Sequence, residues 1–278
     1  MSPSMMAVVA HAGRSPEDTF TVVEVTVPEL RPHDLLVRVR AVSVNPVDTK
    51  VLKRLPPDGS VILGYDAAGV VEAVGSDVTG FSVGDEVYYA GDNTRPGSNA
   101  ELHAVDERIV ARKPTGLDWA EAAALPLTTI TAWESLFDHL SLRSDSRGSL
   151  LIVGGAGGVG SVMIQLAKAL TGVTVIATAG REESCAWVHE LGADHCVGHR
   201  DLVAEVAPLA PEGLDWVFSS HTPGNIDAYA TLLKPFGAIV AVDDDPGSIL
   251  ALKPKAISFH WEYMFTRIIH LTPDVAEQ

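Results

Sequence analysis

The pattern of apolar positions changes near residue 148 of the chain. From there onward, short apolar runs alternate with segments of helical periodicity. Nearly continuous apolar runs are typical of strands that are buried on both faces of a parallel sheet. The clearest runs are Leu150–Val153, Thr174–Ala177, Asp215–Phe218 and Ala238–Val242, and weaker ones occur at His195–Val197 and Ala256–Phe259. This alternation predicts a doubly wound α/β domain with a parallel sheet.

One amphipathic helix is predicted between the first two runs. Its apolar residues recur at the i, i+3, i+4, i+7 spacing that places them on one helix face. They are Val159, Val162, Met163, Leu166, Ala167 and Leu170.

The first 120 residues have a different hydrophobic pattern, in which apolar and polar positions alternate instead of forming continuous apolar runs. The stretch "DLLVRVRAVSV" alternates, and "AAGVVEAVGSDV" and "VGDEVYYAG" are short strand-like segments closed by glycine. Many short strands with glycine turns predict a small, irregular β-barrel. The segment that follows, "LDWAEAAALPLTTITAWESLF", predicts a helical linker that Pro126 breaks into two helices. In the alternating stretch, Leu35, Val37 and Val39 face one side, and Leu36, Arg38 and Arg40 face the other.

Length, charge and cysteine content narrow the classes of protein. A chain of 278 residues predicts about two domains. The net charge of −16 argues against nucleic-acid or anionic-membrane partners, although one small anionic ligand in a locally basic pocket is compatible with it. No apolar run approaches the roughly 18 residues of a membrane span, and the N-terminus lacks signal-peptide features. The two cysteines, Cys185 and Cys196, imply no disulfide framework. We therefore expect a cytoplasmic protein.

A glycine-rich turn joins the run Leu150–Val153 to the predicted helix. Gly155, Gly157 and Gly160 match G-x-G-x-x-G, and Gly158 and Val159 lie within the motif. Glycines allow a tight turn, a close approach to a pyrophosphate and close packing of helix on strand, and the helix N-terminus attracts phosphate. A P-loop is excluded because Ser161 follows Gly160 where that motif needs Lys. The motif predicts a dinucleotide site, and a turn without a ligand is the alternative.

The residues after the second strand bear on which dinucleotide binds. NAD-binding domains place a carboxylate there for the ribose hydroxyls. Here the position 20 residues beyond Gly160 is Gly180, beside Arg181, and Glu182 and Glu183 follow at the expected start of a helix. A guanidinium suits a 2′-phosphate, so NADP(H) is favoured. The alternative is that Arg181 is only a solvated residue at a helix start.

The chain resembles the medium-chain dehydrogenase/reductase superfamily, in particular its quinone-oxidoreductase-like branch, whose members are often named zinc-type alcohol dehydrogenase-like. The resemblance lies in "AVSVNPVDTKV", "LGYDAAGVVEAVG", "FSVGDEVYYAG", "AAALPLTTITAWE", "GGAGGVGSVMIQLAK" and "ISFHWEYMFTR". It implies a GroES-like catalytic domain, a Rossmann domain and a cleft between them. It also implies NADPH-dependent reduction of quinones or α,β-unsaturated carbonyls.

The resemblance also raises the question of zinc. Zinc-dependent members carry Cys where this chain has Asn45, and His followed by Glu where it has Tyr65 and Asp66. A catalytic zinc needs about three Cys, His or carboxylate ligands, and the carboxylates of Asp48 and Asp66 alone make a poor set. Two other clusters are poor candidates, namely His195 with Cys196 and His199, and the acidic run at residues 243–245. We therefore expect no metal site.

Four further residues are candidates for the reaction. Hydride transfer to an enone or quinone builds negative charge on the substrate oxygen, which needs hydrogen-bond donors. Similar enzymes place Tyr65 and Asn45 at the cleft and Thr131 near the nicotinamide, and Ser219 falls at the carboxyl edge of the predicted sheet. The alternatives are a barrel-wall aromatic for Tyr65, a turn before Pro46 for Asn45 and an ordinary helix position for Thr131.

Three functions follow from these residues. The first is a zinc-independent NADPH reductase of small quinones or enones. The second is a zinc-dependent alcohol dehydrogenase, and the third is a non-enzymatic NADPH-binding sensor or structural protein. The expected domains are residues 1–122 for the barrel, 123–260 for the Rossmann domain and 261–278 for the start of a return to the barrel.

The C-terminal sequence predicts an incomplete barrel. Similar enzymes continue beyond "LTPDVAEQ" with a long helix and further strand, so the resemblance implies a C-terminally truncated member. In the last residues, Thr272 is the expected helix N-cap and Pro273 the first helical position. We expect exposed apolar surface on the barrel, lower stability and activity, and a tendency to form a homo-oligomer.

Overall fold

The computed structural model describes residues 3–15 and 17–278 and divides them into two compact units. The barrel unit comprises the chain up to Leu127 together with Phe265–Gln278. The sheet unit comprises Thr128–Met264. The barrel unit is therefore discontinuous in sequence, because its last segment follows the whole of the sheet unit.

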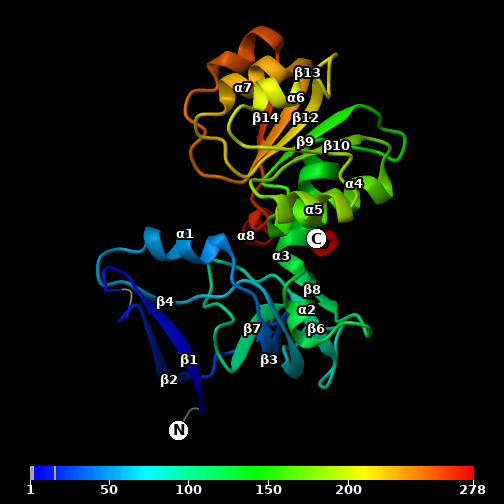
Figure 1. The fold of residues 1–278 in the computed structure, drawn as a ribbon. Helices are drawn as coiled ribbons and strands as arrows, with labels where there is room; N and C mark the ends of the chain where they lie inside the picture. Colours follow the sequence, from blue (N-terminus) through cyan, green and yellow to red (C-terminus); the bar gives the residue numbers. More distant parts are fainter. Residues whose placement is uncertain (1–2, 16) are drawn as a thin grey trace. The chain divides into compact units, whose positions relative to one another are not determined.

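The sheet unit contains a six-stranded parallel sheet, as the apolar runs predict (Figure 1). The strand order β11-β10-β9-β12-β13-β14 runs outward from β9 in both directions, which is the doubly wound arrangement. The strands are β9 (Ser149–Val153), β10 (Thr174–Thr178), β11 (His195–Val197), β12 (Leu214–Ser219), β13 (Leu233–Ala241) and β14 (Ser258–Trp261).

The bounds of two predicted strands were wrong, those of Ala238–Val242 at the start and those of Ala256–Phe259 at both ends. β13 begins five residues before Ala238, because Leu233 pairs with Leu214 ahead of a register shift. β14 begins at Ser258 rather than Ala256, because Ala256 has a left-handed φ of 50° and ends the 3-10 helix η3 (Leu250–Lys255).

Helices cover both faces of this sheet. Leu150 and Ile152 pack in one core with α4 (Gly158–Leu170), whereas Leu151 and Val153 pack in the other with α6 (Leu202–Val206) and α7 (Ile226–Leu232). α5 (Glu182–Glu190) contributes Val188 to the first core. Burial on both faces explains why these strands read as continuous apolar runs.

The predicted linker forms two helices interrupted before Pro126. α2 (Trp119–Ala123) begins with Asp118, whose side chain accepts a hydrogen bond from the Glu121 amide. α3 (Pro126–Trp133) begins at the proline. Proline lacks an N–H group, but this costs no hydrogen bond, because the N–H of the first helical residue has no partner within the helix. It continues into a π-helical turn, η2 (Glu134–His139).

The barrel unit contains two antiparallel sheets, of order β2-β1-β4 and β7-β3-β5-β6-β8. An isolated bridge between Ala7 and Ala100 connects β1 to the chain next to β7. Irregularities in the pairing of β3 with β5 bend the second sheet. The elements are β1 (Ser4–His11), β2 (Phe20–Thr26), β3 (Asp34–Val42), α1 (Pro46–Arg54), β4 (Ser60–Ile62), β5 (Ala67–Val74), β6 (Glu86–Tyr89), β7 (Leu102–Asp106), η1 (Glu107–Ile109) and β8 (Val110–Arg112).

The last segment of the chain packs on the barrel unit. It contains α8 (Thr266–His270) and the 3-10 turn η4 (Val275–Glu277), which lies against η1. The predicted helix start at Thr272 and Pro273 was wrong, because the helical turn begins only after Asp274. The Thr272 carbonyl instead accepts a hydrogen bond from the Val275 amide.

Two further observations concern the chain as a whole. Among residues 3–15 and 17–278, no helix is both long and apolar enough to cross a membrane. The two cysteines, whose low number implied no disulfide framework, form one disulfide, which joins Cys185 on α5 to Cys196 on β11.

A buried ion pair holds the barrel unit together at the start of β3. The Arg95 guanidinium donates to both carboxylate oxygens of Asp34, at 2.9 and 2.6 Å. Asp34 is 1% exposed and also accepts a hydrogen bond from the Arg31 amide. The pair thus anchors the loop before Ser98 to the first residue of β3.

We expect Arg95→Ala to destabilise the protein by about 3–5 kcal/mol, because it leaves the Asp34 carboxylate buried without its counter-ion. Urea unfolding measures this free energy. The control is Arg112→Ala, which removes a pair whose arginine side chain is 62% exposed, and it should change stability little. Similar losses in the two variants would contradict the role given to the buried pair.

Candidate functional site

The glycine turn lies between β9 and α4, as the sequence predicts. Gly154, one residue before the motif, has a φ of 85° and makes the reversal that only glycine adopts readily. Its amide donates to Thr178 Oγ1 at 2.9 Å, and the Gly155 amide donates to the Thr178 carbonyl at 3.0 Å. These bonds attach the turn to the end of β10.

Two glycines of the motif are required by close packing. A Cβ on Gly155 would lie 2.7 Å from Cβ of Ala177, and a Cβ on Gly160 would lie 2.7 Å from Cα of Gly155. Both distances are too short for a side chain. Gly160 therefore lets the first turn of α4 rest on the turn that precedes it.

The remaining glycines form the cradle that a pyrophosphate would occupy. Gly157 is the N-cap of α4 and Gly158 is its first residue, followed by Val159. The first N–H groups of a helix have no partner within the helix and carry its partial positive charge. A Cβ on Gly158 would lie 3.1 Å from Cγ2 of Thr128, so a side chain at this position would press against α3. These features fit a dinucleotide phosphate.

The sheet order brings other predicted residues to the same edge. β10, β9 and β12 are adjacent and parallel, so their carboxyl ends lie side by side. Gly180 and Arg181 follow β10, and both are exposed. Arg181 is the N-cap residue of α5, so Glu182 and Glu183 do begin a helix. Ser219 ends β12.

Ser219 and Thr131 are both buried. Ser219 is fully buried, and its Oγ lies 2.9 Å from the Tyr229 hydroxyl and 3.0 Å from Oγ1 of Thr222. Thr222 in turn donates to Asp243. Thr131 is on α3 and is 6% exposed.

In the barrel unit, Asn45 and Asp66 belong to one buried polar network. Asn45 Nδ2 donates to Oδ2 of Asp66 at 3.1 Å and to the Ser43 carbonyl at 3.4 Å. Asp66 Oδ1 accepts from the Leu127 amide at 3.1 Å. The Asp48 carboxylate accepts hydrogen bonds from the backbone N–H groups of Asn45 and Gly64. The network fixes the start of α1 against the strand that begins after Asp66.

Burial raises the pKa of both carboxyl groups in this network. Asp66 is fully buried, and loss of solvation raises its pKa to about 7, against the opposing hydrogen bonds from Leu127 and Asn45. Asp48 is 6% exposed, and burial raises its pKa as well. Near neutral pH, Asp66 is therefore close to half protonated.

Tyr65 lies beside this network and is 1% exposed. Its ring makes an edge-to-face contact with Phe265, with ring centres 5.7 Å apart. Edge-to-face packing restricts the direction of the ring and of its hydroxyl. A residue of the C-terminal segment thus helps to orient a candidate catalytic side chain.

These residues do not fit a zinc site. Where zinc-dependent members of the family carry a Cys ligand, this chain has Asn45. Its side-chain NH₂ group donates a hydrogen bond to Asp66. Each oxygen of Asp48 and Asp66 accepts a hydrogen bond from the protein. A tetrahedral zinc site needs Cys, His or carboxylate atoms with free lone pairs aimed at one point. We therefore assign no metal to the residues around Asn45 and Asp66.

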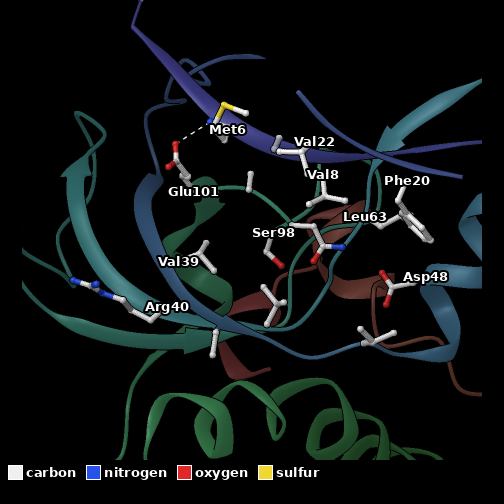
Figure 2. A pocket seen from close by; sticks show the side chains of 16 residues that line it. Met6, Val8, Phe20, Val22, Val39, Arg40, Asp48, Leu63, Ser98 and Glu101 are labelled. Carbon is white, nitrogen blue, oxygen red and sulfur yellow. Dashed lines mark hydrogen bonds between the residues drawn. The ribbon is translucent and has the colours of Figure 1, made fainter. Parts of the chain in front are cut away.

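The barrel unit also contains an apolar groove of about 570 Å³ (Figure 2). Phe20 and Val22 of β2 are 53% and 68% exposed at its wall. Its polar atoms include Ser98 Oγ and the Asp48 carboxylate, and Glu101 accepts a hydrogen bond from the Met6 amide across one side. The groove is thus mostly hydrophobic, with Asp48 linking it to the buried network.

The sequence analysis gave no role in the candidate site, other than as poor metal ligands, to three residues that lie near the predicted ones. Asp66 was considered only as a metal ligand, although it holds Asn45. Ser220 donates to the Val153 carbonyl at 2.9 Å and packs against Gly154. His199 follows β11, and its Cδ2 lies 3.4 Å from where a Cβ on Gly180 would be. A signal for His199 was available, because it follows the carboxyl end of a strand.

A Rossmann-type sheet unit and a GroES-like barrel unit in one chain define a nicotinamide-dependent oxidoreductase. Residues 31–117 match the family model described as alcohol dehydrogenase GroES-like domain, and residues 158–257 match that of zinc-binding dehydrogenase. The chain belongs to the medium-chain dehydrogenase/reductase superfamily, in its quinone-oxidoreductase-like branch.

Similar proteins support this placement. A zinc-type alcohol dehydrogenase-like protein of Staphylococcus aureus is 44% identical over 271 residues, covering 93% of this chain and 79% of that protein. The structure of a putative zinc-dependent alcohol dehydrogenase protein from Rhizobium etli is 50% identical, with a TM-score of 0.94, covering 100% of this chain and 84% of that one.

Two more distant proteins carry names that describe an activity. A chloroplastic NADPH-dependent alkenal/one oxidoreductase of Arabidopsis thaliana is 37% identical over 228 residues, covering 78% of this chain and 57% of that protein. The quinone oxidoreductase of Coxiella burnetii is 30% identical, with a TM-score of 0.78, covering 99% of this chain and 88% of that one.

The raised pKa of Asp66 predicts a pH-dependent stability. The folded carboxyl, with a pKa of about 7, keeps its proton up to about that pH, whereas in the unfolded chain it loses the proton near the ordinary aspartate pKa of 3.8. Between these values the folded state binds more protons, so the free energy of unfolding falls as the pH rises, by up to about 4 kcal/mol. Unfolding measured from pH 4 to 8 should show this decline.

Asp66→Asn should flatten the decline, because the amide does not titrate. The control is Asp77→Asn at an exposed position, which should keep the wild-type slope. An unchanged slope in Asp66→Asn would show that the carboxyl does not carry the effect.

Proposed function

We propose that the protein is an NADPH-dependent oxidoreductase that transfers a hydride to a quinone or an α,β-unsaturated carbonyl compound. The observation that carries this proposal is the glycine turn at the carboxyl edge of the sheet, with Gly180 and Arg181 where a NAD site has a carboxylate. The names of the alkenal/one and quinone oxidoreductases among its relatives agree with it.

The sheet unit supplies the proposed cofactor site. The amides around Gly157, Gly158 and Val159 hold the pyrophosphate, and Gly155 and Gly160 permit that backbone geometry. At the end of β10, Gly180 leaves space and the Arg181 guanidinium binds the 2′-phosphate. Thr131 and Ser219, both buried, complete the proposed cofactor residues.

The barrel unit supplies the proposed hydrogen-bond donor for the substrate oxygen. When bound, the reduced nicotinamide supplies the hydride. Tyr65 is the stronger donor candidate, because its phenol is oriented by Phe265. Asn45 is the second candidate, but its NH₂ group already donates to Asp66 and Ser43. The final proton comes from solvent.

The proposed reaction is independent of zinc, because the donor atoms around Asn45 and Asp66 are committed to hydrogen bonds within the protein. The proposed substrate is a small molecule, and neither nucleic acid nor membrane is a partner. We place the enzyme in the cytoplasm, with self-association into a homo-oligomer as the expected assembly.

The decisive experiment measures NADPH oxidation against a panel of quinones and enones. We expect turnover with at least one member of the panel, less than one equivalent of zinc in the same sample, and no loss of rate after treatment with a chelator. Stoichiometric zinc with loss of activity on chelation would favour the alcohol dehydrogenase instead. NADPH binding without turnover of any substrate would favour a non-enzymatic sensor.

A second prediction concerns cofactor preference. We expect tighter binding of NADPH than of NADH, by about one to two decades, because a charge-assisted phosphate contact contributes roughly 1.5–3 kcal/mol. Arg181→Ala should remove most of the difference in dissociation constants measured by cofactor fluorescence. Arg143→Ala, an exposed arginine before the amino end of β9, is the control and should keep it. Equal binding of the two cofactors by the wild type would refute the assignment.

A further inference from the structure

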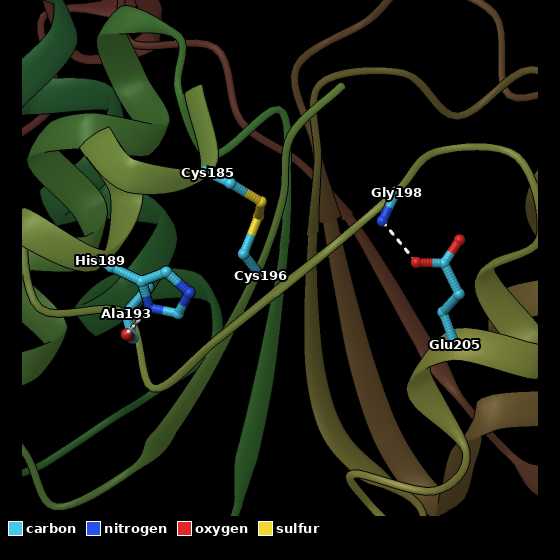
Figure 3. The surroundings of a disulfide bond; sticks show 6 residues. All are labelled: Cys185, His189, Ala193, Cys196, Gly198 and Glu205. Carbon is cyan, nitrogen blue, oxygen red and sulfur yellow. Dashed lines mark hydrogen bonds between the residues drawn. A yellow bond between two sulfur atoms is a disulfide. The ribbon is translucent and has the colours of Figure 1, made fainter. Parts of the chain in front are cut away.

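The single disulfide among the described residues lies next to the proposed 2′-phosphate site. Cys185 is in the first turn of α5, and Cys196 is the middle residue of β11 (Figure 3). Their Cα atoms are 5.7 Å apart, a usual spacing for a disulfide. Both residues are partly exposed.

One end of this cross-link holds the segment that carries Arg181. The Cys185 amide donates to the Arg181 carbonyl at 2.9 Å, which is the first helical hydrogen bond of α5. The backbone of Arg181 is thereby tied to Cys185 one turn later. The direction of the Arg181 side chain therefore depends on where the disulfide holds the first turn of α5.

The other end of the cross-link holds the segment that carries His199. Cys196 pairs with Ala177 of β10, and the Ala179 amide donates to the Val197 carbonyl at 2.9 Å. Gly198 then donates to Oε2 of Glu205 at 2.6 Å (Figure 3). The next residue, His199, approaches Gly180. The disulfide therefore joins the two segments that flank Gly180.

We propose that the Cys185–Cys196 disulfide is a reversible redox switch that pre-organises the residues around Gly180 for the 2′-phosphate of NADPH. The inference rests on the proposed cofactor site. β11 has only three residues at the edge of the sheet, so α5 and β11 have greater relative freedom once the cross-link is opened. Binding must then order Arg181 and His199, which weakens the affinity for NADPH.

The chemistry of the switch is thiol–disulfide exchange with a dithiol. A thiolate of the dithiol attacks one sulfur, the Cys185–Cys196 bond breaks, and the departing thiolate takes up a proton. The second thiol of the reagent then displaces the other cysteine, so the dithiol becomes a disulfide and the protein gains two thiols. In a reducing compartment such as the proposed cytoplasm, disulfides are usually transient, catalytic or redox-sensing.

A purely structural cross-link would affect the two cofactors equally. It would change global stability, and with it the binding of NADPH and NADH alike. A switch at the phosphate site changes NADPH binding selectively, because NADH has no 2′-phosphate. The difference between the two cofactors therefore separates the two roles.

The test measures dissociation constants for NADPH and NADH by cofactor fluorescence, in protein oxidised with diamide and in protein reduced with dithiothreitol. A count of free thiols accompanies each state, with zero and two expected. Reduction should weaken NADPH binding about twofold to tenfold and leave the dissociation constant for NADH unchanged. The double variant Cys185→Ser with Cys196→Ser should match the reduced protein under both conditions, and its melting temperature verifies that it is folded.

Three results would overturn the switch, namely no change on reduction, an equal change for both cofactors, or two thiols that diamide does not join. Arg181→Ala in the oxidised state distinguishes this failure from failure of the proposed function. If Arg181→Ala removes the preference for NADPH and reduction does not affect it, only the switch is wrong. If neither affects the preference, the phosphate site itself is misassigned.

Discussion

The close approach of Gly160 to Gly155 is the contact on which the sheet unit's candidate site depends. With only hydrogen atoms between the two backbones, α4 begins directly at the end of β9. A methyl group on either residue would force the helix away from the sheet. The N–H groups of the first turn therefore come to the carboxyl edge of adjacent strands, which is the place where the proposed function puts the cofactor phosphates.

The barrel unit has a different kind of constraint, which is electrostatic. Asp66 lies in an interior where its charge is poorly solvated, and its hydrogen bonds from Asn45 and Leu127 compensate only in part. The network fixes the side chain of Asn45, because its NH₂ group donates to both Asp66 and the Ser43 carbonyl. Asn45 therefore has a structural role in the barrel unit.

Much of the fold was predictable because continuous apolar runs have few other interpretations. Leu150–Val153 and Thr174–Ala177 agree with β9 and β10 to within one residue, and Pro126 does divide the linker. The early start of β13 was hidden by Pro235 and Gly237, which usually argue against a strand. The pairing of Cys185 with Cys196 depends on α5 lying over β11, which no local pattern encodes. The glycine motif predicted the turn between β9 and α4, but not that Gly154 makes it, and no motif predicted that Asp66 binds Asn45.

The discontinuity of the barrel unit has a consequence for biosynthesis. A chain leaves the ribosome from its N-terminus, and domains generally fold as they emerge. Tyr65 emerges early, but Phe265, which orients its ring, follows only after every strand of the sheet unit has been made. The nascent barrel must therefore persist without its last packing partner during that interval, with an apolar surface that chaperones or neighbouring chains can bind. The order of synthesis thus makes the surroundings of Tyr65 the last part of the barrel to become native.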